Sequence, residues 1–498
     1  MIIIYLVIFL KKNILILLVA TIITRILGFI FLIPFARLVG TKGTSLYSYA
    51  YIPYCLFLDI SSFGIPIGIS KIIITNDKNK QKDIIIKSFK IILIISIILF
   101  IVFNLLSKRY SNIVLANKNL DNKIEDVTKV VRIISLTLLI TPLIAVIRGY
   151  HQGNHNVKIT SITFILEQVI RLLLMLLGSY IIIKILKLDY TKAIYFSVFS
   201  SFISNLIVLI YSLFTLKFEG NNKINNKKLL KDLFKYTLPF SIYGITFSLF
   251  QLIDSLYFNK GLIEYGINNP EYYYGIYSFE IQRIINLPVS IILSIQIAIM
   301  PSISEDYENK NYKLIKFKII KIYKLIFIFL LPLIFINILY SEDIYNLFYH
   351  QNKGDILRDS SILILLYTLT IILSNIMLGI NLEEKLLILI IIINILKIFI
   401  TKHLINNYGI KGIINSNIIP LLIFIILSTY YVFSKIDISL NITNIIIKIL
   451  LLNVSIIFLL SILNNYYKIK YYYNIFMYII LIISFYIKTK LLKVHKLI

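Results

Sequence analysis

Long apolar runs alternate with short polar segments along the whole chain. A run of about 20 apolar residues has the length that a helix needs to cross the hydrocarbon core of a membrane. Counting runs by this rule predicts about fourteen membrane-spanning helices. The expected spans are residues 14–36, 45–70, 86–106, 131–150, 159–183, 192–216, 237–258, 275–300, 319–340, 360–380, 385–401, 411–434, 442–463 and 472–487. The pattern therefore predicts an all-α, polytopic membrane protein.

Composition agrees with this class, since 58% of residues are hydrophobic and the mean hydropathy is +0.86. The formal net charge is +27, but the lysines gather in the short segments between apolar runs. That distribution is typical of cytoplasmic loops beside anionic headgroups, so we expect a lipid partner and no nucleic acid. The chain has one cysteine, Cys55, which excludes an internal disulfide and a cysteine-based metal cluster. Five scattered histidines also disfavour a metal site.

Basic segments predict the orientation in the cytoplasmic membrane. Segments 78–87, 217–235, 310–324 and 488–496 are rich in lysine and fall on one side when the spans are counted. Both termini are therefore expected to be cytoplasmic. Segment 107–129 is an exception, because it is basic on the outer side and its charge is only partly offset by Asp121, Glu125 and Asp126.

A weak internal repeat suggests two pseudo-symmetric halves. Residues 64–73 read GIPIGISKII and residues 297–306 read IAIMPSISED, and each places a proline shortly before an Ile-Ser pair. Transporters are often built from such repeats, with the substrate site at the repeat interface. Punctuation of helix ends by glycine and proline is the alternative. The expected organisation is an extension at 1–13, an N-lobe at 14–216, a basic cytoplasmic linker at 217–236, a C-lobe at 237–434, and two further helices with a basic tail at 435–498.

Charged residues inside the apolar runs are the main functional signal. Arg25 lies about half-way along the first span, where a cation costs on the order of 2.5–3.5 kcal/mol. Cations outnumber acids at the deep positions, and a cationic surplus facing a hydrated cavity suits phosphate, which the arginine fork binds through two parallel hydrogen bonds. The deep charges are Arg25, Asp59, Glu167, Arg171, Asp254, Arg283 and Lys397.

Ordinary ion pairs are the alternative for these residues. Glu167 and Arg171 are spaced to pair within one helix. Pairs between helices would join the remaining acids and arginines, namely Asp59 and Asp254 with Arg25 and Arg283.

Helix-end cations have a simpler explanation. We favour the interpretation that the charged groups of three such residues extend to the lipid headgroups, namely Arg37, Lys71 and Arg148. Two roles are possible for Asp254, which lies near Gln251 and Ser255. It could bind Na⁺ or a proton and couple transport to an ion gradient, or it could be a plain counter-ion.

Several stretches together resemble one known family. They are TRILGFIFLIPFARLVG at 24–40, SSFGIPIGISK at 61–71, VIRGYHQGNHNVKITSITFILEQVIR at 146–171 and QRIINLPVSIILSIQIAIMPSIS at 282–304. They resemble the polysaccharide biosynthesis and export branch of the multidrug/oligosaccharidyl-lipid/polysaccharide exporter (MOP) superfamily. More narrowly, the sequence is similar to the Gram-positive group that contains stage V sporulation protein B and the lipid II flippases.

This resemblance implies two six-helix lobes around a central cationic cavity, with two further helices. It also implies that Arg25 and Arg283 contact a diphosphate, and that Asp254 resembles an ion-coupling position of some relatives. The family commonly has another basic residue just after the Gly-Phe pair, and residues 29–32 contain none. The residues predicted to bind the diphosphate are Arg25, Arg283, Arg37 and Arg171, and those predicted to couple an ion or serve as counter-ions are Asp254, Asp59 and Glu167.

The resulting hypothesis is a flippase rather than an enzyme. It would move undecaprenyl-diphosphate-linked cell-wall precursor (lipid II) by alternating access, as a monomer without an organic cofactor, with Na⁺ or H⁺ as the candidate coupling ion. Another polyprenyl-linked or sporulation-specific glycan is an alternative, as is a drug/cation antiporter of the same superfamily, which the basic charge disfavours. A glycosyltransferase or lipid phosphatase would need convergent acids or a histidine nucleophile, and the loop with His151 and His155 lacks a matching acidic cluster.

Overall fold

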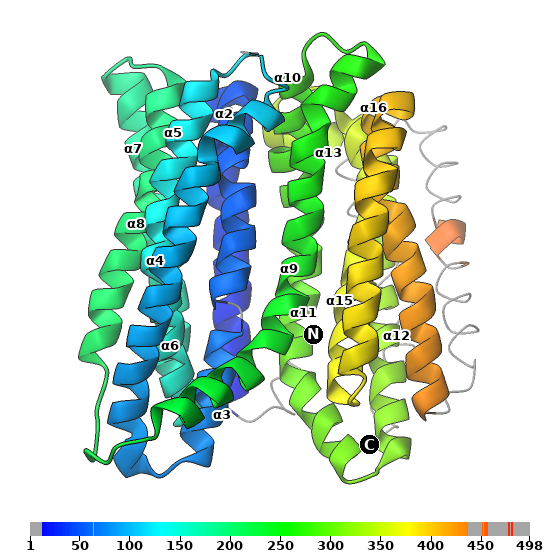
Figure 1. Cartoon of the computed structure of the whole chain (residues 1–498). Coiled ribbons are helices and arrows are strands. Elements are labelled where there is room, and N and C mark those ends of the chain that lie inside the picture. Colours follow the sequence, from blue (N-terminus) through cyan, green and yellow to red (C-terminus); the bar gives the residue numbers. More distant parts are fainter. Residues whose placement is uncertain are drawn as a thin grey trace. The chain divides into compact units, whose positions relative to one another are not determined.

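The computed structural model describes residues 12–62, 64–118, 120–436, 451, 453–456, 477, 478, 480 and 481. Every regular element within these residues is a helix (Figure 1). Eight helical stretches of this part are long and apolar enough to cross a membrane, so the all-α membrane class is confirmed. Each of the first twelve predicted spans overlaps a helix. The last two, 442–463 and 472–487, fall mostly outside the described residues, so the count of fourteen stays a prediction.

The chain divides into two compact units. Unit 1 comprises Met1–Ala298 and Glu383–Pro420, and unit 2 comprises Ile299–Leu382 and Leu421–Ile498. The boundaries of the two predicted lobes stay a prediction. All the residues of the candidate site lie in unit 1.

Helix α2 (Lys12–Ser62) is the central element of unit 1. It packs against α7 (Val157–Tyr180) and α9 (Asn226–Tyr265). The helix bends at Gly40, whose φ of 68° and ψ of 178° are accessible in practice only to glycine. The first predicted span and most of the second are therefore two arms of one bent helix, which continues after a short break into α3 (Ile65–Thr75).

Isoleucine packing joins the next helices. Ile69 and Ile73 of α3 belong to a buried apolar cluster with side chains of α4 (Gln81–Val114) and α6 (Thr141–Gly153). Two glycines of α6 allow this approach, because a Cβ added at Gly149 would lie 2.6 Å from Ile69 Cβ, and one at Gly153 would lie 2.7 Å from Ile73 Cβ. Small residues commonly permit such close packing between membrane helices. Helices α5 (Ile124–Ser135) and α8 (Tyr190–Phe214) pack against each other and also against α2.

The later helices of unit 1 begin and end at recognisable signals. Asn225 caps α9 by accepting a hydrogen bond from Lys227 N, and Gly266 ends it in the left-handed region. Helix α10 (Pro270–Gly275) continues through a π-helical turn, Ile276–Ile281, into α11 (Gln282–Glu308). Helix α16 (Glu383–Ile436) bends at Gly409, and its part up to Pro420 belongs to unit 1.

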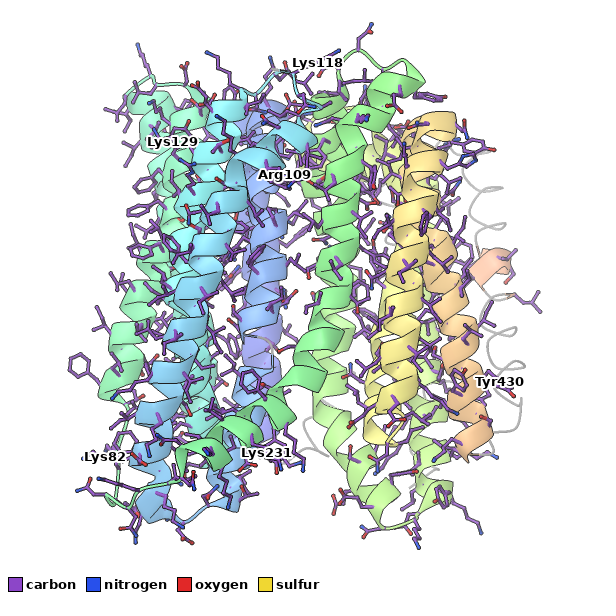
Figure 2. The ribbon with its side chains drawn as sticks, in the orientation of Figure 1. Lys82, Arg109, Lys118, Lys129, Lys231 and Tyr430 are labelled. Carbon is purple, nitrogen blue, oxygen red and sulfur yellow. The ribbon has the colours of Figure 1, made fainter. Side chains whose placement is uncertain are left out.

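Two of the predicted basic segments lie side by side in unit 1. Lys82 Nζ donates to Asn221 Oδ1 at 2.8 Å, and Lys87 Nζ donates to the Ile224 carbonyl at 2.7 Å. Figure 2 shows Lys82 and Lys231 at one end of the helices and Lys118 and Lys129 at the other. Segments 78–87 and 217–235 therefore share one side, as expected, whereas the cytoplasmic location of that side stays a prediction.

Unit 2 contains the remaining described helices. These are α12 (Tyr312–Leu339), α13 (Ser341–Tyr349), α14 (Gly354–Ser360) and α15 (Leu363–Gly379). Helix α12 packs against α14 and α15, and α13 packs against α14. Lys318 near the start of α12 forms an ion pair with Asp306 and also donates to the Ser302 carbonyl at 3.1 Å, which holds the turn before α12.

Replacement of Gly40 by alanine tests the bend in α2. A side chain at this φ and ψ should cost about 1–3 kcal/mol, so the thermal unfolding midpoint of the detergent-solubilised Gly40→Ala protein should fall. Thr41→Ala, at the neighbouring half-buried position, is the matched control and should change the midpoint little. An unchanged midpoint for Gly40→Ala would contradict the bend.

Candidate functional site

Three arginines from three helices gather in unit 1. Arg25 of α2 lies near enough to Arg171 of α7 and Arg283 of α11 for the three charges to interact. Tyr51 lies among them, because Arg171 Nη1 is 3.5 Å from its hydroxyl and the Arg283 guanidinium is 5.6 Å from its ring centroid. The Arg25 side chain is exposed, and the other two are half-buried. We call these three residues the arginine cluster.

Aromatic side chains support the arginine cluster. Tyr47 stacks on Tyr51 with ring centroids 5.4 Å apart. It also forms T-shaped pairs with Phe35 and Phe279, at centroid separations of 5.8 Å and 5.6 Å. The Arg283 guanidinium lies 5.1 Å from the Phe279 ring, which is cation–π geometry. Sequence reasoning missed these aromatic residues, because a chain with 36 tyrosines and 32 phenylalanines gives no local signal for particular ones.

The arginine cluster is not ion-paired within the described part of the chain. Arg171 Nη2 donates to Gln168 Oε1 at 2.7 Å, but no ion pair there includes a member of the cluster. The Nε atoms of Arg171 and Arg283 are buried and have no hydrogen-bond partner. Guanidinium groups with unused donors are suited to an anion that presents several oxygens, and phosphate is the best match in shape.

Glu167 pairs with a different arginine from the one expected. Its Oε2 accepts a hydrogen bond from Arg148 Nη2 at 2.7 Å, and Arg148 Nε donates to Thr163 Oγ1 at 3.0 Å. The Arg148 guanidinium also lies 3.9 Å from the Phe164 ring centroid, and the residue is 7% exposed. Two expectations are therefore wrong: Glu167 does not form an ion pair with Arg171, and Arg148 does not extend to the headgroups. The consequence is that Arg171 is left to join the arginine cluster.

Asp254 likewise has its own partner. Lys397 of α16, which is fully buried, places Nζ 2.5 Å from Asp254 Oδ1. The alternative in which Asp254 pairs with an arginine is therefore wrong. Counting Lys397 among surplus cations is also wrong, because its charge is matched within unit 1.

The other predicted residues lie apart from the arginine cluster. Asp59 is half-buried on α2 and hydrogen-bonds to Ser248 of α9, with no ion pair to an arginine among the described residues. Arg37 is exposed and lies twelve residues after Arg25, which is about 18 Å along the helix. Lys71 is exposed, and its ammonium lies 4.6 Å from the centroid of the Tyr236 ring.

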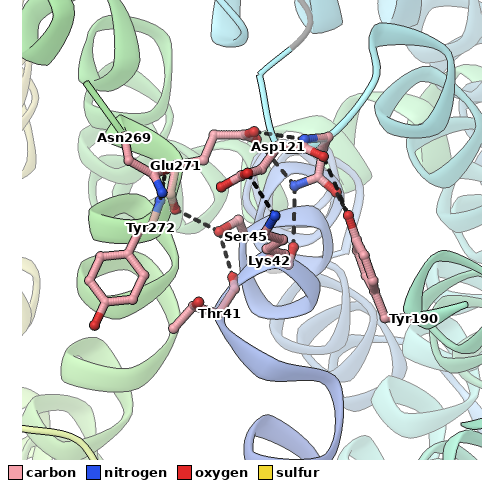
Figure 3. Close-up of polar contacts among 9 residues, drawn as sticks. Thr41, Lys42, Ser45, Asp121, Tyr190, Asn269, Glu271 and Tyr272 are labelled. Carbon is pink, nitrogen blue, oxygen red and sulfur yellow. Dashed lines mark hydrogen bonds and ion pairs between the residues drawn. The ribbon is translucent and has the colours of Figure 1, made fainter. Parts of the chain in front are cut away.

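A second polar cluster anchors α10 beside the bend in α2 (Figure 3). The buried Glu271 carboxylate accepts hydrogen bonds from Asn122 N at 2.8 Å and from Asn122 Nδ2 at 3.2 Å. Ser45 Oγ donates to the Glu271 carbonyl at 2.7 Å, and Lys42 Nζ lies 2.9 Å from Asp121 Oδ1. The sequence singled out Asp121 only as an offset to a basic loop, and nothing in it pointed to Glu271.

Close packing strengthens this anchor. A Cβ added at Gly275 would lie 2.6 Å from both Ser45 Oγ and the Thr41 carbonyl oxygen, so α10 can touch α2 only with glycine there. The π-helical turn that follows carries Phe279, and the first turn of α11 carries Arg283. The second polar cluster therefore helps to fix where the third arginine lies.

Comparison with known proteins decides the family. The family model for polysaccharide biosynthesis proteins matches residues 10–306, more than half of the chain. The chain belongs to this family. The predicted resemblance to the MOP-superfamily flippase group is thereby confirmed.

Curated relatives of this family member come from Bacillus subtilis (strain 168). Lipid II flippase MurJ is 27% identical over 412 residues, which cover 77% of this chain and 75% of that protein. Stage V sporulation protein B is 26% identical over 323 residues, which cover 62% of this chain and 60% of that protein.

Solved structures show the same fold. An inward-facing multidrug resistance MATE family transporter of the MOP superfamily aligns with a TM-score of 0.67 at 16% identity, over 84% of this chain and 99% of that chain. MurJ is named a flippase and the solved neighbour a transporter, so the expectation of a transporter rather than an enzyme is confirmed.

A pH series tests the environment of Glu271, which lies outside the membrane-spanning stretches. Burial raises the pKa of this carboxyl above its ordinary value of about 4.3. The folded state therefore favours the protonated carboxyl. The stability that protonated Glu271 contributes is lost as pH rises through the raised pKa. Glu271→Gln should be more stable relative to wild type near neutral pH, and the difference in unfolding midpoint should shrink as pH falls toward about 4.

The exposed Glu125, changed to glutamine, is the control for this series and should show no such trend. If the difference in unfolding midpoint between wild type and Glu271→Gln instead widened on acidification, the folded state would be stabilising the carboxylate form.

Proposed function

We propose that this protein is a flippase that moves a diphosphate-linked lipid glycan precursor across the cytoplasmic membrane by alternating access. Lipid II, the undecaprenyl-diphosphate-linked precursor of peptidoglycan, is the substrate we favour. The observation that carries the proposal is the arginine cluster, which brings three cations from α2, α7 and α11 together without an ion pair in the described part of the chain.

The chemistry of the arginine cluster fits a diphosphate. Each arginine in a membrane helix costs on the order of 2.5–3.5 kcal/mol, and an anionic ligand offsets that cost when it binds. Planar guanidinium groups donate paired hydrogen bonds to phosphate oxygens, and the exposed Arg25 offers the first contact. Arg171 supplies a cation that the family pattern would place just after the Gly-Phe pair of α2, where this chain has none.

Similarity to the named relatives supports the substrate class. One curated relative is named as a lipid II flippase, and the alignment with it covers three quarters of each chain. The arginine cluster fits phosphate oxygens, which every polyprenyl-diphosphate-linked glycan carries. A flippase for another polyprenyl-linked glycan, including one used in sporulation, is thus the sister proposal.

A multidrug antiporter is the second candidate, because a solved MATE transporter shares the fold. Cationic drugs would need unpaired acids near the bound ligand. Glu167 and Asp254 are instead paired with Arg148 and Lys397. Asp59 hydrogen-bonds to Ser248 and lies apart from the arginine cluster, which is cationic. The charge distribution therefore favours an anionic substrate.

Alanine substitution of the arginine cluster tests the proposal. Arg25→Ala and Arg283→Ala should each lower the rate of flipping of a fluorescent lipid II analogue in proteoliposomes by about tenfold or more, because each removes charge-assisted hydrogen bonds. Arg109→Ala, at an exposed position of α4, is the matched control and should retain the wild-type rate. Wild-type flipping by both cluster variants, or full growth of a strain depleted of its own flippase and supplied with them, would refute the assignment.

Cys55 provides an independent probe, since it is the sole cysteine of the chain. It is half-buried and lies one turn after Tyr51. Its thiol interacts with one negative charge, that of Asp59, and with the two positive charges of Arg283 and Arg171. A negatively charged methanethiosulfonate should label it faster than a positively charged reagent of similar size, and a polyprenyl diphosphate should slow labelling. Arg283→Ala should reduce the preference for the negative reagent, and Cys55→Ser is the blank. Faster labelling by the cationic reagent would contradict an anion site.

A further inference from the structure

A buried polar group lies in unit 1 around the ion pair of Asp254 and Lys397. Lys397 Nζ contacts Asp254 Oδ1 at 2.5 Å and donates to Ser416 Oγ at 2.9 Å. Asn417 Nδ2 donates to Asp254 Oδ2 at 2.8 Å and to the Tyr277 hydroxyl at 3.1 Å. Asp254 is 6% exposed, and Lys397, Ser416 and Asn417 are fully buried. The group joins α9, the π-helical turn and both arms of the bent α16.

The atoms around the ammonium are those that a hard cation takes as ligands. They are a carboxylate oxygen and a hydroxyl oxygen, with an amide side chain adjacent. The Asn417 Oδ1 atom is buried and has no hydrogen-bond partner, so one further oxygen is unused in this group. An ammonium on a lysine side chain therefore lies in surroundings that would also suit a free monovalent cation.

Charge balance explains why a cation is required here. A carboxylate as buried as Asp254 is very unfavourable without a positive partner, and removing one partner of a buried pair typically destabilises a protein strongly. Phe250 contributes a ring whose centroid lies 5.5 Å from Lys397 Nζ, which adds cation–π attraction. The lysine satisfies the carboxylate within the chain itself.

We propose that Lys397 is a built-in counter-cation, whose ammonium occupies the position that a free Na⁺ would otherwise take beside Asp254. The expected use of Asp254 to bind a coupling Na⁺ therefore does not fit this chain. One consequence, that translocation needs no free cation at this position, rests on the proposed function. The assignment of Lys397 itself does not.

Two substitutions of Lys397 separate charge from space. Lys397→Ala leaves the oxygen atoms around an opened volume, whereas Lys397→Met fills nearly the same volume without charge. In detergent, the unfolding midpoint of Lys397→Ala should rise by a few degrees when about 100 mM choline chloride is replaced by NaCl, because a ligand that binds only the folded state stabilises it. Lys397→Met and the wild-type protein should show no such rise. The double variant Lys397→Ala with Asp254→Asn should lose the response.

The unfolding midpoints bear on the inference without reference to transport. Equal Na⁺ stabilisation of wild type and Lys397→Ala would overturn it, and so would a Lys397→Ala protein that folds but responds neither to Na⁺ nor to Li⁺. If Lys397→Ala cannot be purified folded, the wild-type protein still decides. Its unfolding midpoint and its rate of flipping should be the same in Na⁺-free and Na⁺-containing buffers. A midpoint that rises with Na⁺, or flipping that requires Na⁺, would overturn the proposal. Loss of flipping in both buffers would instead count against the proposed function.

Discussion

The cost of placing a charge in apolar surroundings governs this structure. Each charged side chain inside the helices needs a partner. In unit 1 some charges are matched by an opposite charge of the chain, and others are left for a ligand. Arg148 is matched by Glu167, and Lys397 is matched by Asp254, in both cases with further hydrogen bonds. The arginine cluster has no such internal match within the described residues. The difference separates charges that stabilise the fold from charges that are available to a ligand.

Bends and close contacts in the helices bring the arginine cluster together. Gly40 bends α2 between Arg25 and Tyr51, so these two residues lie on different arms of the same helix. Gly28 leaves room for the Gln168 side chain of α7, since a Cβ there would lie 2.8 Å from Gln168 Nε2, and Gln168 in turn holds Arg171. The anchor of α10 beside the bend sets the start of α11. Residues from widely separated parts of the sequence thus depend on a few glycines.

The two proposals describe complementary uses of charge. The arginine cluster keeps positive charge available for an anionic lipid head group, whereas the group around Asp254 supplies its own cation and is electrically complete. A transporter arranged in this way would bind an anion without needing to load a free cation beside Asp254. The similarity to flippases and the charge of the arginine cluster therefore support the same class of substrate.

The sequence by itself determined the class of protein, because the length and apolarity of each run are local properties that the membrane imposes. It also identified Arg25, Arg171 and Arg283 as costly residues that require an explanation. Only the tertiary structure decided which of these charges are paired, because partners such as Lys397 for Asp254 are 143 residues apart and no local spacing connects them. The helix spacing that favoured Glu167 with Arg171 was overridden by Arg148, which lies on a neighbouring helix and offers a closer, better-packed contact.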